Sequence, residues 1–66
     1  MEQFTRREIA VINELRTGSQ NKTIAHQLGI TEATVKVHVR SIARKLKATN
    51  RTQIALWAHR QATWNY

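Results

Sequence analysis

Apolar residues recur every three or four positions along most of the chain, which is the spacing of one face of an α-helix. The clearest run lies in residues 32–46. There Val35, Val39, Ile42 and Leu46 share one side when successive residues are turned by about 100°. Proline is absent, and β-branched residues never alternate with polar ones over the length of a strand. The pattern therefore predicts an all-α fold.

Local end signals divide the chain into four helices, at about residues 6–16, 21–28, 32–46 and 51–63. Thr5 and Glu8 form a capping box for the first helix, in which each side chain accepts from a backbone amide near the helix start. Gly18 suits the left-handed conformation that often follows a helix. Because 66 residues supply apolar material for only a single core, we predict one bundle-like domain over residues 1–66.

The other helix starts are marked less evenly. Thr31 is a strong N-cap for the third helix, and Asn50, with a glutamine three residues later, is one for the fourth. For the second helix, Ser19 and Asn21 are both suitable caps and Gln20 is a weaker one. The first residue of the second helix thus stays open at this stage.

Residues 21–46 have the spacing of a helix-turn-helix unit. Ala25 is followed four positions later by Gly29 and then six positions later by Val35, so that two helices can approach closely and turn sharply. Spacing alone also fits a generic helical hairpin. The positions expected to face the core are Ile9, Val11, Ile12, Leu15, Ile24, Ala25, Leu28, Ile30, Val35, Val39, Ile42, Leu46, Ile54, Ala55, Ala58 and Ala62.

The opposite side of the third helix is positively charged. It carries Lys36, Arg40, Arg44 and Lys47, with Ser41 beside them. Val37 lies in the middle of this stripe. At this position it is not buried in the core, so it has no role in folding. A DNA major groove would use the whole set, because cations bind phosphates and guanine edges and apolar side chains pack on the thymine methyl group. We therefore predict that the third helix is a recognition helix.

The charge distribution supports a nucleic-acid partner. Residues 1–32 contain four cations and four acids, whereas the rest of the chain contains seven cations and no acid. The sequence pI is about 11.3, and a domain with one sign of charge gathered on one half suits a polyanion. A merely solvated basic face is the alternative.

Several other classes of protein are disfavoured. The chain has no cysteine, and none of its three histidines (His26, His38 and His59) is paired at i, i+4 with another metal ligand. We therefore expect no metal and no cofactor. Four scattered glutamates indicate no acid/base pair, and we expect no enzyme and no catalytic residue. Neither a membrane span nor a secretory signal is present, so we expect a cytoplasmic, nucleoid-associated protein with no small-molecule ligand in this domain.

The segment GSQNKTIAHQLGITEATVKVHVRSIARKLKATNRTQIALWA resembles the DNA-binding domain of LuxR/NarL-type (GerE-like) bacterial transcription regulators. The similarity runs from FTRRE to ALWAH, and TVKVHVRSIARKL with NRTQ is its most specific part. The resemblance implies a four-helix domain whose third helix reads the major groove. It also implies homodimerisation through the fourth helix on an inverted-repeat site.

Site residues follow from the resemblance together with the helical pattern. Base contacts are expected from Lys36, Val37 and Arg40. Phosphate contacts are expected from Asn21, Lys22, Thr34, Arg44 and Lys47. Dimerisation is expected to use Leu56, Trp57 and Arg60, because apolar residues on the outer flank of the last helix, Trp64 among them, suggest a second contact surface.

The sequence departs from the family pattern where the family usually has a proline, a serine cap and a glutamate; these positions hold Arg6, Gln20 and Thr23. The changes remove helix-start signals and leave the outward stripe intact. Trp57 has another interpretation, in which it folds back over the first helix and completes the core.

Three alternative functions remain. One is a sigma-factor-like module that binds promoter DNA and contacts RNA polymerase. RNA polymerase is also a further candidate partner if the chain is a LuxR-type regulator. Another is a tryptophan-centred protein-interaction module. The third, a membrane-surface helix, is disfavoured because the outer face has no continuous apolar strip. Target operator, input signal and activation versus repression are not encoded in a form we can interpret, and the chain is either a piece of a longer regulator or a stand-alone one.

Overall fold

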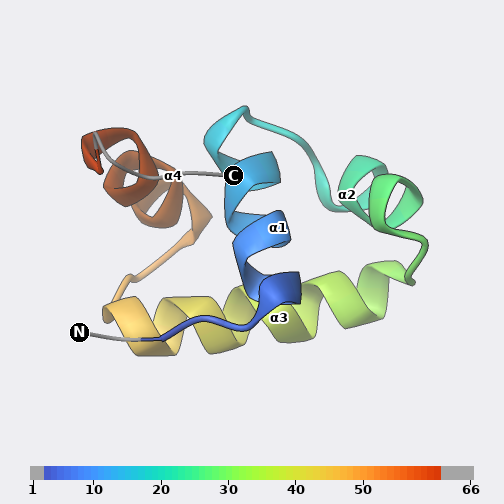
Figure 1. Cartoon of the computed structure of the whole chain (residues 1–66), viewed down its shortest axis with the longest axis horizontal. Helices are drawn as coiled ribbons and strands as arrows, with labels where there is room; N and C mark the ends of the chain where they lie inside the picture. The colour runs from blue at the N-terminus through green and yellow to red at the C-terminus, as the bar shows by residue number, and fades with distance from the viewer. Residues whose placement is uncertain (1–2, 62–66) are drawn as a thin grey trace.

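A computed structural model describes residues 3–61 of the chain, and within them it contains four helices and no strand (Figure 1). The helices are α1 (Arg6–Arg16), α2 (Asn21–Leu28), α3 (Glu32–Leu46) and α4 (Arg51–Arg60). The predicted all-α class is confirmed. In Figure 1, α1 rises from the long α3, with α2 on one side of it and α4 on the other.

The core lies where α1 meets the other three helices. Its fully buried side chains come from every helix and are Val11, Ile12, Ile24, Val35, Ile42 and Ile54. All six are on the predicted inward list, and burying each of them stabilises the fold by about 1.5–3 kcal/mol. Val39 and Leu46 of α3 are only partly buried and pack against the edge of this core.

Side-chain caps begin three of the four helices. The Thr5–Glu8 capping box is present, with the Glu8 amide donating to Thr5 Oγ1 over 3.1 Å. Thr31 Oγ1 accepts from the Thr34 amide, and Asn50 Oδ1 accepts from the Gln53 amide. The Gln53 side chain accepts from the amide of Thr49 rather than that of Asn50. The reciprocal bond of the capping box is therefore displaced by one residue, while the Asn50 cap itself is present.

The N-cap of α2 is not one of the two stronger candidates, Ser19 and Asn21. Gln20 is the N-cap and makes no side-chain cap hydrogen bond, while Asn21 is the first helical residue. The side chains of Ser19 and Asn21 do not cap because each is engaged elsewhere. Ser19 Oγ donates to Glu14 Oε1, and Asn21 Oδ1 accepts from Arg51.

Left-handed residues end α2 and α3. Gly29 has φ 67° and closes α2, and the Ile30 amide then donates to the Ala25 carbonyl across the turn. Lys47 has φ 56° and closes α3, although it is not glycine. Side chains with a Cβ adopt this conformation at a cost, so the α3–α4 joint contains local strain.

The predicted end of the fourth helix at residue 63 is wrong, because α4 ends at Arg60 and Gln61 is its C-cap. Ala58 is the last buried residue of α4. The repeat of alanines in the sequence continues past this point and does not mark the helix end. The inward position expected for Ala62 and the outward one expected for Trp64 lie outside the described residues.

Candidate nucleic-acid interface

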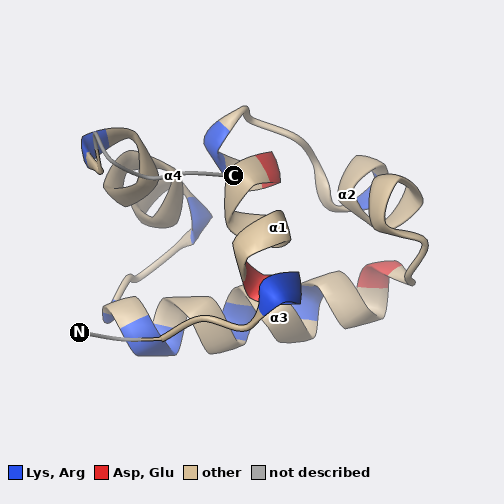
Figure 2. Ribbon diagram, viewed as in Figure 1, with Lys and Arg blue, Asp and Glu red and all other residues tan. Residues whose placement is uncertain are grey.

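The outward face of α3 is open to solvent along the predicted stripe. Lys36, Arg40 and Arg44 are all exposed, and Val37 between them keeps 58 % of its surface accessible. Figure 2 shows that Lys and Arg recur along α3 as far as its C-terminal end, with an acidic band only near its start. A valine this exposed among cations gains nothing from the core of its own domain.

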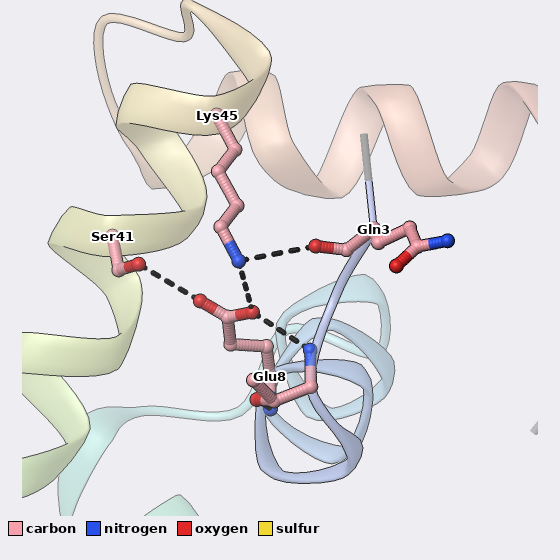
Figure 3. Close-up of polar contacts among 5 residues, drawn as sticks. Gln3, Glu8, Ser41 and Lys45 are labelled. Atoms are coloured by element: carbon pink, nitrogen blue, oxygen red, sulfur yellow. Dashed lines mark hydrogen bonds and ion pairs between the residues drawn. The ribbon is translucent and has the colours of Figure 1, made fainter. Parts of the chain in front are cut away.

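The inward side of α3 holds the helix in place. Val35 and Ile42 are fully buried, and α1, α2 and α4 all pack against α3. Ser41 lies beside the outward stripe, as expected, and is half-buried. Ser41 lies on the α1 side, where its hydroxyl donates to Glu8 Oε2 over 2.8 Å (Figure 3).

Glu8 joins α1 to α3 from a buried position, with 4 % of its surface exposed. Lys45 Nζ donates to Glu8 Oε1 over 2.7 Å and to the Gln3 carbonyl over 3.1 Å (Figure 3). Burial by itself would raise the pKa of Glu8. The hydrogen bonds from Lys45, the Thr5 amide and Ser41 outweigh burial and lower the pKa from its ordinary value of 4.5 to about 2.

This cluster was missed by the sequence analysis, which treated Glu8 only as a cap. Its α3 members, Ser41 and Lys45, are 33 and 37 residues from Glu8 along the chain, so no local sequence signal indicates that they meet Glu8. One consequence is that Lys45, which is half-buried, is bound to Glu8 of α1. The positive outward face is therefore made by the other cations of α3.

The expected phosphate-contacting residues do not share one environment. Lys22, Arg44 and Lys47 are exposed. Thr34 is half-buried, and its hydroxyl lies 2.9 Å from that of Thr31. Asn21 is half-buried with its side-chain oxygen bound to Arg51, so its amide nitrogen is the part left to face a ligand.

An open hollow of about 320 Å³ lies beside the exposed face of α3. Its lining comes from α2, α3 and the α3–α4 joint with the first residue of α4, and consists of Asn21, Lys36, Val39, Arg40, Ala43, Thr49, Asn50 and Arg51. The helical pattern of the sequence does not indicate that Arg51 belongs to this site. Its place in the wall of this hollow depends on tertiary contacts with α2.

The outer surface of α4 is less apolar than expected. Leu56 is 47 % exposed and Arg60 is exposed. Trp57 is instead half-buried and packs against the core, with its ring centroid 5.8 Å from that of Phe4 in an edge-to-face arrangement. Trp57 thus packs against the core, as the second interpretation expected, while its part in dimerisation stays a prediction. The exposed outer flank of α4 is represented in the described residues by Leu56 and Arg60.

A comparison with protein families decides what kind of domain this is. The model described as bacterial regulatory proteins of the luxR family matches residues 2–58. The chain belongs to this family.

Curated relatives of this luxR-family domain are regulators. The chain is 42 % identical over 59 residues to the nitrate/nitrite response regulator protein NarL of Escherichia coli (strain K12), covering 89 % of the chain and 27 % of NarL. It is 52 % identical over 57 residues to the transcriptional regulatory protein LnrK of Bacillus subtilis (strain 168), covering 86 % of the chain and 26 % of LnrK. The luxR-family domain thus spans about a quarter of the length of these relatives.

The described part of the luxR-family domain contains neither a candidate metal site nor a helix that could span a membrane. Among residues 3–61, no three His, Cys, Asp or Glu side chains gather into a group that could hold a metal ion. Of the helices in that range, none combines the length and apolar character needed to cross a bilayer. His59, one of the histidines considered for a metal, lies with Nε2 3.0 Å from the Arg16 carbonyl and so links α4 to the end of α1.

Proposed function

We propose that this domain binds double-stranded DNA in a sequence-specific manner as part of a bacterial transcription regulator, with α3 inserted in the major groove. The observation that carries the proposal is the exposure of Val37, at 58 %, between exposed cations on a helix whose opposite side is buried. With 15 residues, α3 is about 22 Å long at 1.5 Å per residue, and a helix of this kind fits the major groove.

Each exposed residue has a distinct role in this proposal. Lys36 and Arg40 donate to acceptors on base edges, preferably those of guanine, and Val37 packs on a base methyl group. Lys22, Arg44 and Lys47 neutralise backbone phosphates on either side. The membership of the luxR family and the regulator names of the relatives support a role in transcription regulation, while the role of each residue rests on its exposure and chemistry.

Two copies of the domain bind an inverted repeat in this proposal. Leu56 and Arg60 on the outer side of α4 form the contact between copies, with Trp57 supporting α4 from within. The regulator acts in the cytoplasm on the nucleoid. It is either the output domain of a response regulator or a stand-alone protein, and RNA polymerase is a further candidate partner.

Binding-site selection from random duplex DNA tests the proposal, because it yields the half-site, the spacing and the symmetry together. On the selected site, Lys36→Ala and Arg40→Ala should each cost about 1–3 kcal/mol and relax the preference at one base pair. Lys22→Ala should instead weaken binding to all sequences by the same factor. Arg6→Ala, which removes an exposed cation of α1, is the control and should leave the base preference unchanged.

Two results would contradict the proposal. One is a mobility-shift titration in which the Lys36 and Arg40 variants bind the selected site as tightly as the wild type. The other is a failure of selection to enrich any sequence. A protein-interaction module would also differ in its salt response, because its binding should weaken little with salt whereas DNA binding should weaken steeply.

A further inference from the structure

The hollow between α2, α3 and the start of α4 has the composition of an anion site. Three of its lining residues are cations, namely Lys36, Arg40 and Arg51, and two are asparagines, whereas no acid lines it within the described part of the chain. Its α3 wall includes the two residues assigned above to base edges. The hollow is therefore continuous with the face that would meet DNA.

Arg51, which lines this hollow, is held by two hydrogen bonds. Its Nη1 donates to Asn21 Oδ1 over 2.6 Å, and its Nη2 donates to the Ser19 carbonyl over 2.7 Å. Both acceptors are neutral, so these bonds orient the guanidinium without cancelling its charge. A guanidinium has five N–H donors, and the remaining ones are available to a ligand.

Positive charge gathers around Arg51. It is the first residue of α4 and binds the first residue of α2, so its cation lies near the positive ends of two helices. Lys36 and Arg40 line the same hollow and add like charge. A negatively charged group entering the hollow would relieve the repulsion among these groups.

We propose that this hollow is a seat for one phosphodiester of the DNA backbone, with Arg51 as the residue that binds it directly. The inference rests on the proposed function and adds a contact that neither the sequence pattern nor the family assignment supplied. Arg51 would bind this phosphate while its two bonds to α2 keep α4 at a set distance from the helix-turn-helix unit. The same residue then links backbone binding to the placement of the helix that carries Leu56.

The test separates a charge contact from a purely structural role through the salt dependence of binding. Each phosphate contact contributes about −0.9 to the slope of log K against log salt on duplex DNA. Loss of one contact in Arg51→Gln should therefore flatten the slope by about 0.9, so that the affinity defect shrinks about 3.5-fold between roughly 50 and 200 mM salt. Arg51→Lys, which keeps the charge without the planar fork, should retain the wild-type slope.

Arg6→Gln is the matched control, since it removes the same charge from an exposed position on α1 and should leave the slope unchanged. Thermal unfolding of each variant establishes that it is folded at the assay temperature. A measurement on the wild type is independent of any variant: in a nitrogen-edited NMR spectrum, the Arg51 Nε–H signal should shift when the selected duplex is added.

The outcomes distinguish the two proposals. A wild type that shows no binding to duplex DNA would remove the proposed function itself. A wild type that binds, combined with an Arg51→Gln defect that is the same factor at every salt concentration and an unshifted Arg51 Nε–H signal, would overturn the phosphate seat alone. Arg51 would then be only a structural fork between α2 and α4.

Discussion

Replacing Glu8 by glutamine should destabilise the domain more than any other single removal of a carboxylate. The side chain is 4 % exposed and receives hydrogen bonds from Lys45, the Thr5 amide and Ser41. Its pKa is lowered from 4.5 to about 2, and at about 1.4 kcal/mol per pKa unit this corresponds to about 3 kcal/mol at neutral pH. Because Lys45 is 26 % exposed and partly screened by solvent, this is an upper figure.

The sign of the pH dependence follows from the direction of the shift. Between its folded and unfolded pKa values, Glu8 binds more protons in the unfolded chain, so stability rises with pH in that window. The contribution is complete above about pH 4.5 and is lost as the pH falls toward 2. Between about pH 6 and pH 3.5, the wild type should lose about 1.4 kcal/mol through this group.

Urea unfolding followed by far-UV circular dichroism at several pH values measures both effects. At neutral pH, Glu8→Gln should lower the free energy of unfolding by about 2–3 kcal/mol, a large part of the roughly 3–10 kcal/mol typical of a domain of this length. The variant should also lack the acid-induced loss assigned to Glu8. Glu32→Gln is the control, because it removes an exposed carboxylate from the first turn of α3 and should cost no more than about 1 kcal/mol.

The reasoning would be refuted if Glu8→Gln lost as much stability as the wild type between about pH 6 and pH 3.5. A wild-type stability that does not change over this range would refute it equally. Either result would mean that the carboxylate ionises in the folded domain much as it does in the unfolded chain.

Two further predictions concern the joint after α3 and the outer side of α4. Lys47→Gly should raise the free energy of unfolding by about 0.5–1 kcal/mol in thermal or urea unfolding, because a backbone φ of 56° is strained for a residue with a Cβ. The same change should weaken DNA binding, because it removes a phosphate contact. A fall in stability would show that the Lys47 side chain contributes more than its backbone costs. Leu56→Glu should change stability by no more than about 0.5 kcal/mol, since Leu56 is 47 % exposed, while reducing affinity for an inverted repeat and sparing a single half-site. Equal binding of the repeat by Leu56→Glu and wild type in a mobility shift would place the contact between copies elsewhere.

Local sequence signals predict the four-helix architecture, most helix boundaries and the outward face of α3. Helical periodicity and caps are local properties, so the Thr5–Glu8 box, the Gly29 turn and the split between Val35 and Val37 could be predicted from spacing alone. The expected exposure of Lys36, Val37 and Arg40 is met for the same reason, and their contacts with bases remain a prediction.

Contacts between side chains of different helices depend on how the helices pack against one another. Ser41 binds Glu8, Trp57 packs on Phe4, and Arg51 binds the start of α2, all over separations of 30 residues or more. A helical pattern specifies the direction of a side chain relative to its own axis, whereas its partner depends on how the axes cross. The roles of Ser41, Trp57 and Arg51 could not be predicted for this reason, because each depends on a partner in another part of the chain.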